Sequence, residues 1–465
     1  MYDWVILGAT SLALGLAGAL SAEKQQVLVI DKTEMVASEF VAAFRPGKSW
    51  SADLQTALAR SIRDAMIGQG LLAGDTACTH AAGSLFYRAY HALPADLLLD
   101  TAIMAIRTAQ SGYELDCHAA GSHMTVKTRA IFDTTADRIT LRTKSLHAIL
   151  ACQTGEAPEP QADGCFNFRL DTVLEPPAVI LEMPCPIDES LIAARHRLIE
   201  RFTALPEAGC WKIAAIANCF AETPLAEDVT PDPGFPVLPS CRFDNPLLAI
   251  DAGWMQGEKA AEKRPAKFMK YPASQTAAPV KSARTAEWDR CIWIDGPHKE
   301  SASGVTFDLE TQIVVAGVGT AGAYAVWSAA RQGAAVIGID KQPGVGGMGT
   351  YGYVSGYYYG AAGGLHVSLD QEAETLAKNT FVDTVEAKKY LLEQKAMAAG
   401  ATFLFSARVV GVYLEADVVR GVAVWTEGRL IRIACDLAID ATAEAELCRA
   451  AGCAIEFGQI GRAHV

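Results

Sequence analysis

The strongest periodic pattern of the chain lies near its middle. An unbroken apolar run at residues 313–316 is followed by a glycine-rich turn at residues 317–322 and by an apolar stretch of helical length. A second apolar run, residues 336–339, then ends in Asp340. Short apolar runs bounded by turn residues are typical of buried strands. The pattern therefore predicts a strand, a tight turn, a helix and a second parallel strand.

The glycines of this turn stand where a dinucleotide-binding motif requires them. Gly317 permits the tight turn, Gly319 lets main-chain N–H groups approach a diphosphate, and Gly322 lets the helix pack closely on the strand. The N-terminus of the helix adds partial positive charge. Asp340 follows Gly319 by 21 residues, where a carboxylate can accept the ribose hydroxyls. We expect a dinucleotide site here; the alternative is a glycine-rich turn that binds no ligand.

A second glycine cluster, at residues 344–349, bears on which dinucleotide is bound. Glycines so soon after Asp340 let the main chain approach a ligand that extends past its ribose. With Gly-Gly-Met-Gly-Thr at residues 346–350, the sequence resembles the FAD-dependent oxidoreductases of the glutathione-reductase-like superfamily, particularly its fumarate-reductase-like branch. The resemblance implies an α/β Rossmann-like fold, with a parallel sheet and an antiparallel meander in three layers, and FAD as the cofactor.

Later segments extend this resemblance to about residue 458. A helical stretch precedes residues 401–412, which we expect to form a third parallel strand. Alternating segments at residues 421–426 and 430–434 are expected to form the meander. Residues 437–447 then resemble the family's Asp-Ala-Thr-Gly turn, except that Ala443 replaces the glycine.

The resemblance also implies which residues hold FAD. The backbone of Val409 would face the adenine, and the glycine turns would face the diphosphate. The implied cofactor-binding residues are Gly317, Gly319, Thr320, Ala321, Gly322, Asp340, Lys341, Gly346, Gly347, Met348, Thr350, Val409 and Thr442.

The N-terminus repeats the central layout in a changed form. An apolar run at residues 4–7, a glycine turn, a helical stretch and a second run ending in Asp31 follow the same order. Thr10 and Ala13 stand where the central turn has its second and third glycines. We interpret residues 1–262 as a degenerate flavoprotein-like unit, although such an outline can also arise without common ancestry. Whether this first unit binds FAD stays open, because Thr10 adds a side chain where the diphosphate would lie.

Three more segments suit a flavoprotein-like first unit. Residues 126–137 parallel the turn at Asp440, and residues 246–253 resemble the last strand of flavoproteins, whose Asp contacts the flavin side of the cofactor. Residues 146–220, with a helix near residues 189–203, suit a substrate-type subdomain.

Length supports more than one unit, since 465 residues exceed one ordinary domain. The Lys-, Ala-, Pro- and Ser-rich residues 263–310 are expected to be a linker with a short ordered piece at residues 288–294. Residues 311–465 form the expected FAD-binding second unit. The final residues 460–465 resemble one reading frame of a sequencing adapter, so we expect a C-terminally truncated second unit, and His464 is given no chemical role.

Charge and composition narrow the function classes. A net charge of −13 argues against nucleic acid as a partner, and the 12 cysteines contain no CxxC pair, so no metal site is expected. The apolar residues 4–20 follow Asp3 instead of positive charge, and glycines interrupt them. They therefore fit neither a secretory signal nor a membrane span, and a cytoplasmic location is expected.

Candidates for the substrate side follow the second glycine cluster. Residues 351–360 alternate glycine with tyrosine, which suits a loop over an aromatic ring, and Tyr353 offers a phenol. His366 is a candidate acid or base. Structural roles are at least as common for both residue types. Glu444 and Glu446 open a helix and are interpreted as partners of its dipole.

Together these features predict an FAD-dependent oxidoreductase that transfers hydride between a small organic substrate and flavin. Alternatives are an NAD-linked or tRNA-modifying flavoprotein, and a pseudoenzyme or interaction module that retains the fold. The sequence indicates neither the substrate nor the oligomeric state.

Overall fold

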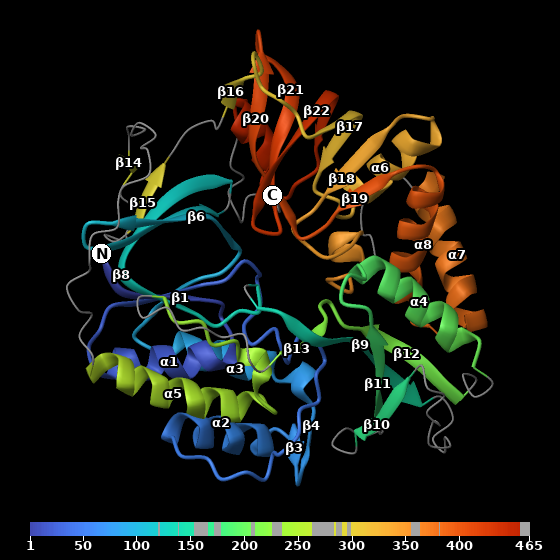
Figure 1. The fold of residues 1–465 in the computed structure, drawn as a ribbon. Coiled ribbons are helices and arrows are strands. Elements are labelled where there is room, and N and C mark those ends of the chain that lie inside the picture. Colours follow the sequence, from blue (N-terminus) through green and yellow to red (C-terminus); the bar gives the residue numbers. More distant parts are fainter. Residues whose placement is uncertain are drawn as a thin grey trace, which may run out of the picture.

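The computed structural model describes most of the chain, in two large mixed sheets and a smaller antiparallel one (Figure 1). The described residues are 1–119, 121–137, 139–152, 166–171, 178–205, 210–225, 235–262, 283–284, 291–294, 299–354, 363–380 and 382–455. The predicted α/β class, with parallel strands and antiparallel meanders, is confirmed.

The first unit is built on an eight-stranded sheet. Its strands are β1 (Tyr2–Leu7), β2 (Val27–Ile30), β5 (Asp96–Leu98), β6 (Thr101–Ala109), β7 (Gly112–Ala119) and β8 (Ser122–Asp133), joined by β14 (Ala283–Arg284) and β15 (Cys291–Ile294) of the linker. Strands β8, β1, β2 and β5 run parallel, whereas β6, β7 and β8 form a meander. A short hairpin, β3 (Leu72–Ala73) and β4 (Thr76–Ala77), lies outside the sheet.

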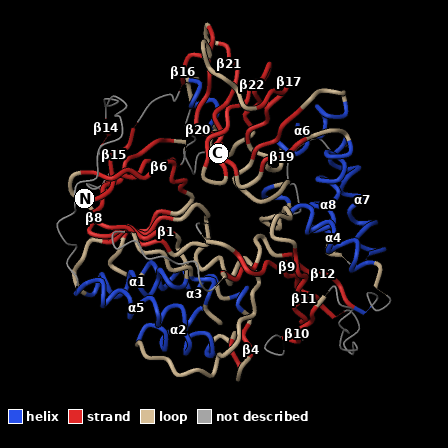
Figure 2. The backbone as a smooth tube through the Cα atoms, in the orientation of Figure 1, coloured by secondary structure: helices blue, strands red, loops and turns tan. Residues whose placement is uncertain are grey.

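Helices α1 (Ser11–Ala22), α2 (Ala57–Gly68), α3 (Gly83–His91) and α5 (Pro246–Glu262) lie on one side of this sheet (Figure 2). Helix starts are fixed locally, since Thr10 and Thr56 each accept a hydrogen bond from a main-chain N–H in the first turn. Strands β1 and β2 bury almost every residue: one face, including Ile6 and Val29, packs with these helices, and the other, including Val5 and Leu28, packs with β7 and β8.

Helix α5 corrects one expectation. Residues 246–253 were expected to form a strand with an Asp at the flavin, but they open a continuous helix. It packs on α1 so closely that a Cβ at Gly253 would lie 2.0 Å from the carbonyl oxygen of Leu12. Asp251 instead accepts hydrogen bonds from the N–H groups of Gln55 and Thr56 and so holds the start of α2.

The subdomain expected at residues 146–220 is an antiparallel sheet with one helix. Its elements are β9 (Leu141–Cys152), β10 (Asn167–Asp171), β11 (Ala178–Cys185), β12 (Trp211–Ile216), β13 (Ala221–Pro224) and α4 (Leu191–Thr203). This subdomain does not have a separate core. Its buried Leu146, Leu198 and Ile213 belong to one apolar cluster with Val326 and Leu391 of the second unit.

The second unit has a seven-stranded sheet in the order β16-β20-β21-β22-β17-β18-β19. Its elements are β16 (Lys299–Ser301), β17 (Leu309–Ala316), α6 (Gly322–Arg331), β18 (Val336–Ile339), α7 (Gly364–Thr380), α8 (Thr384–Ala398), β19 (Thr402–Leu404), β20 (Ala407–Glu415), β21 (Val418–Thr426), β22 (Arg429–Asp440) and α9 (Glu446–Ala451). Strands β22, β17, β18 and β19 are parallel, and β20, β21 and β22 form the meander.

Two strand boundaries differ from the expectation. Residues 401–412 do not form one strand, because Ser406 adopts a left-handed φ of 50° and divides them into β19 and β20. Residues 430–434 and the strand before Asp440 are one element, β22, since both pair continuously with β17 or β21.

The linker adds strands to both sheets. Strand β15 (Cys291–Ile294) pairs with β8 of the first unit, and β14 (Ala283–Arg284) pairs with β15. Strand β16 runs parallel to β20 of the second unit. The expected ordered piece thus includes β15, whereas Trp288 lies outside the described residues. In the described part, no helix is long and apolar enough to cross a membrane, and no group of three or more His, Cys, Asp or Glu side chains could hold a metal ion.

Candidate functional site

The central glycine turn has the geometry that its sequence predicts. Gly317 directly follows β17 and has φ of 80°, and its N–H donates to the carbonyl oxygen of Ile339 at 2.8 Å. A Cβ at Gly322 would lie 1.8 Å from the carbonyl oxygen of Gly317, so only glycine lets α6 begin this close to the strand. A Cβ at Gly317 would meet the backbone of Ala441 at 2.7 Å.

Gly319 differs from these two, because space lies beside it. A Cβ at Gly319 would have the Cα of Gly347 as its nearest neighbour, 4.0 Å away. The second glycine cluster is folded onto the turn: Gly346 donates its N–H to the carbonyl oxygen of Val318 at 2.9 Å, and the Thr320 hydroxyl donates to the Gly346 carbonyl oxygen at 3.1 Å. The two glycine segments therefore lie together, with main chain exposed for a ligand's close approach.

Asp340 lies at the end of β18, beside the same turn. Its two carboxylate oxygens accept hydrogen bonds from the N–H groups of Val318, at 2.5 Å, and Gln342, at 2.8 Å. Burial raises the pKa of Asp340, and these two hydrogen bonds act in the opposite direction. Each carboxylate oxygen still has a lone pair, so the group can also accept ribose hydroxyls.

The remaining predicted cofactor residues surround this centre. Thr350 is buried and donates to the Val345 carbonyl oxygen at 2.5 Å, whereas Met348 is 63% exposed. Thr442 donates its hydroxyl to Asp440 at 2.7 Å, which shapes the turn after β22. Val409 lies on β20, whose first residue, Ala407, donates its N–H to the Asp340 carbonyl oxygen at 2.9 Å. Lys341 forms ion pairs with two carboxylates of the first unit, Glu34 at 2.8 Å and Asp100 at 2.7 Å.

The first unit repeats this backbone pattern closely. Gly8 has φ of 90° and donates to Ile30 at 2.8 Å, as Gly317 donates to Ile339. Ala9 donates its N–H to Asp31 at 2.6 Å, as Val318 donates to Asp340. The two β1–β2 and β17–β18 pairs also share a register, since each places the residue before the glycine opposite the residue before the acid.

The start of α1, however, is closed by side chains. Glu39 accepts the Ser11 N–H at 2.8 Å, and Ser240 accepts the Leu12 N–H at 3.1 Å and donates to Glu39 at 2.6 Å. The Thr10 hydroxyl accepts the Ala13 N–H at 3.2 Å. A carboxylate of the protein thus lies at the helix N-terminus, where an anionic ligand would bind. At α6, by contrast, no side chain caps the helix start in the described part of the chain.

Sequence reasoning missed Glu39. The signal was its position, since Glu39 follows Asp31 by eight residues just as Met348 follows Asp340 by eight. This carboxyl group lies in the loop that matches the second glycine cluster and already accepts an N–H group that a phosphate ligand would use.

The two candidate catalytic residues have separate partners. The Tyr353 hydroxyl donates to Glu386 at 3.2 Å, and burial raises its pKa. His366, near the start of α7, lies 3.2 Å from Asp370. Residues 355–362, which include most of the expected tyrosine loop, lie outside the described residues.

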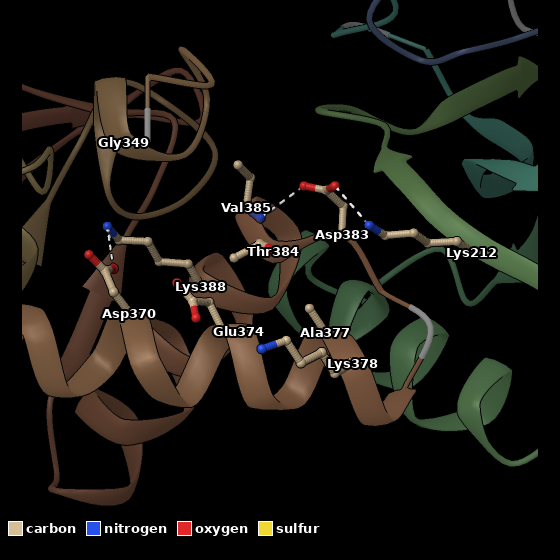
Figure 3. Close-up of a pocket in the computed structure, with 10 residues that line it drawn as sticks. All are labelled: Lys212, Gly349, Asp370, Glu374, Ala377, Lys378, Asp383, Thr384, Val385 and Lys388. Carbon is tan, nitrogen blue, oxygen red and sulfur yellow. Dashed lines mark hydrogen bonds and ion pairs between the residues drawn. The ribbon is translucent and has the colours of Figure 1, made fainter. Parts of the chain in front are cut away.

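Beside the second glycine cluster is a cleft of about 830 Å³ (Figure 3). It is bounded by Gly349 at one end, by Lys212 of β12 at the other, and by α7 and the start of α8. Its lining residues are Lys212, Gly349, Asp370, Glu374, Ala377, Lys378, Asp383, Thr384, Val385 and Lys388. Lys388 pairs with Asp370 at 2.7 Å, so Asp370 links the cleft wall to His366. Three lysines and three carboxylates line this cleft, so a ligand in it would meet charges of both signs.

A buried charged cluster that sequence reasoning also missed lies between α4 and α8. Arg195 pairs with Glu393, and His196 lies 3.0 Å from the other oxygen of Glu393. Arg195 also donates to the Tyr351 hydroxyl at 3.1 Å, and the Lys389 ammonium lies 4.4 Å from the centre of the Tyr351 ring. This cluster therefore holds Tyr351, two residues after the second glycine cluster.

Comparison with protein families identifies the C-terminal segment. Residues 312–465 match the family model described as FAD dependent oxidoreductase. For this segment the match confirms the predicted FAD-dependent oxidoreductase class and FAD as the cofactor. It covers about a third of the chain and does not extend to the first unit.

Solved structures with a similar fold include p-nitrophenol 4-monooxygenase PnpA from Pseudomonas putida DLL-E4, with 11% identity and a TM-score of 0.39, covering 57% of this chain and 79% of that one. Glycine oxidase from Geobacillus kaustophilus has 16% identity and a TM-score of 0.38, covering 58% and 96%. OxyS anhydrotetracycline hydroxylase from Streptomyces rimosus has 14% identity and a TM-score of 0.42, covering 56% and 62%. Comparison with curated proteins gives no match.

Proposed function

We propose that the protein transfers hydride between a small organic substrate and an FAD held by the second unit. The observation that carries this proposal is the open main chain at Gly319, beside Gly347 and the uncapped start of α6. These groups would bind the diphosphate, while Asp340 would accept the ribose hydroxyls. FAD, when bound, supplies the flavin ring that takes up or releases the hydride.

The protein's own residues would bind and orient the substrate. The cleft beside Gly349 supports this role, because it borders the second glycine cluster and joins His366 through Asp370. His366 would hold or move a proton at Nε2. The Tyr353 hydroxyl donates its only proton to Glu386, so its oxygen lone pairs would accept a hydrogen bond from the substrate, and its raised pKa disfavours a role as a base.

We further propose one FAD per chain. The first unit has the same turn, but Glu39 and Ser240 already satisfy the N–H groups at the start of α1. A diphosphate there would first have to displace the Glu39 carboxyl from the Ser11 N–H and the Ser240 hydroxyl from the Leu12 N–H. For the first unit alone, this closed turn favours the second candidate function, in which the flavoprotein fold is retained but binds no ligand.

The test is flavin content after purification with added FAD. We expect about one flavin per chain by absorbance, and a Gly319→Val variant should lose it while keeping its far-UV circular dichroism, because space is open beside Gly319. Gly68→Val is the matched control, since a Cβ at Gly68 would meet no atom within 4 Å and Gly68 lies far from the turn in sequence. A wild-type chain without flavin, or a Gly319→Val variant that stays yellow, contradicts the proposal. Two flavins per chain contradict the role given to Glu39.

A further inference from the structure

Arg408 precedes Val409, whose backbone is expected to face the adenine. The surroundings of the Arg408 side chain are unusual. Its side chain is only 5% exposed, and one guanidinium nitrogen, Nη2, pairs with Asp100 of the first unit. The other, Nη1, is buried and has no hydrogen-bond partner among the described residues. Arginine stays charged in proteins, and a buried charged donor without an acceptor is costly. This donor therefore indicates an acceptor supplied by a ligand.

The position of Arg408 defines which part of a ligand it would meet. Arg408 follows Ala407, whose N–H donates to the main-chain oxygen of Asp340, the expected ribose-binding residue. Asp100 bridges Arg408 and Lys341, the residue after Asp340, through its two carboxylate oxygens. Arg408, Asp100 and Lys341 thus contact one another next to the residue expected to bind the ribose.

Asp100 is held in place by its own unit. It follows β5 in a left-handed conformation with φ of 52°, and its N–H donates to the Thr33 carbonyl oxygen at 2.8 Å. The same loop conformation occurs in the second unit at Ser406, with φ of 50°. Asp100 is therefore a fixed anion that the first unit presents to Lys341 and Arg408.

We propose that Nη1 of Arg408 donates a hydrogen bond to the adenosine half of the bound dinucleotide, at an adenine ring nitrogen or a ribose oxygen. Asp100 is the positioning residue that orients the guanidinium. The first unit, whose own turn is closed by Glu39, thereby completes the cofactor site of the second. This inference rests on the proposed function, because it places the cofactor at Gly319 and Asp340.

A second carboxylate also faces this arginine. Glu446, at the start of α9, has a pKa that burial raises and that Arg408 and Lys341 lower. If the only role of Arg408 were to pair with Glu446 and Asp100, replacing Arg408 would leave adenosine binding unchanged. The affinity for an adenosine-containing ligand therefore separates the two roles.

The experiment measures FAD affinity of the full chain by flavin fluorescence, with ADP and FMN as competitors. Arg408→Met keeps the apolar stem and removes the donors; we expect FAD and ADP to bind about tenfold to a hundredfold more weakly, with FMN unchanged, because FMN has no adenosine. Asp100→Asn should weaken ADP binding several-fold, because Asp100 orients the guanidinium of Arg408. Glu415→Gln, on the same strand β20 and paired with the exposed Arg420 at 3.2 Å, is the control and should change nothing.

Unchanged ADP affinity in a folded Arg408→Met variant overturns the inference. If the Arg408→Met variant does not fold, the Asp100→Asn variant is the test. An unchanged ADP affinity of that variant also overturns the inference. A wild-type chain that binds ADP but not FAD contradicts the proposed function, while the ADP comparison still decides the role of Arg408.

Discussion

At the scale of single residues, position in the turn decides what each glycine does. Gly317 and Gly322 are required by the protein's own backbone, whereas Gly319 keeps space open. The sequence predicted these roles because they depend on local geometry. It did not predict Glu39 or Asp100, because their partners, Ser11 and Ser240 for one and Lys341 and Arg408 for the other, are set by loops that meet only in the folded chain.

A substitution at Gly322 tests this division. Gly322→Ala should destabilise the fold by about 3 kcal/mol, because its Cβ would overlap the Gly317 carbonyl oxygen at 1.8 Å and the backbone must move. Chemical denaturation with and without FAD measures the effect. A Gly322→Ala variant as stable as wild type would show that α6 does not depend on this contact.

At the scale of elements, helix ends and ion pairs join parts that are distant in sequence. The strand expected at residues 246–253 was wrong, although Asn245 and Pro246 carried the correct signal: Asn245 accepts the Leu248 N–H at 2.9 Å, and proline suits the first helical position. The apolar run suggested a strand because α5 packs against both α1 and α2 and therefore has only a narrow polar face.

The ion pair between α4 and α8 gives the second prediction. Burial raises the pKa of Glu393, but the charges of Arg195 and His196 outweigh it, and the pKa ends below its usual 4.5. Its stabilisation is therefore complete above pH 4.5 and is lost as pH falls through the lower folded-state pKa. Glu393→Gln should cost about 3 kcal/mol at pH 7, since it leaves the buried Arg195 charge without its carboxylate.

Denaturant titrations at pH 7 and near pH 3 measure both parts of this prediction. The difference between wild type and Glu393→Gln should shrink at the lower pH. Glu415→Gln, which removes one carboxylate of an exposed pair, serves as the control and should change stability by less than about 1 kcal/mol. A difference independent of pH would contradict the assignment of Glu393 as the titrating group.

At the scale of the whole molecule, the two units are interdependent. The sequence predicted a division at residues 263–310, and strands from that segment join both sheets. It did not predict that the subdomain of the first unit shares its core with the second. Alternating apolar positions identify which face of a strand is buried, but they do not identify the surface that covers it.

Separating the units should therefore expose apolar surface. Residues 1–262 expressed alone should bind a hydrophobic dye and lack a sharp thermal transition in the subdomain, because Leu198 and Ile213 would lose the cover of Val326 and Leu391. The full chain should unfold this subdomain and the second unit in one transition. A fragment that stays compact and binds no dye would contradict the shared core.

The strands contributed by the joining segment have a protective consequence. Strand β15 runs along residues 123–126 of β8, β14 along β15, and β16 along residues 412–414 of β20, so part of the main chain of two long strands is already paired. Unpaired strand borders act as templates on which neighbouring molecules add strands and form aggregates. In this protein the tether between the units also protects part of one border of each large sheet from such pairing.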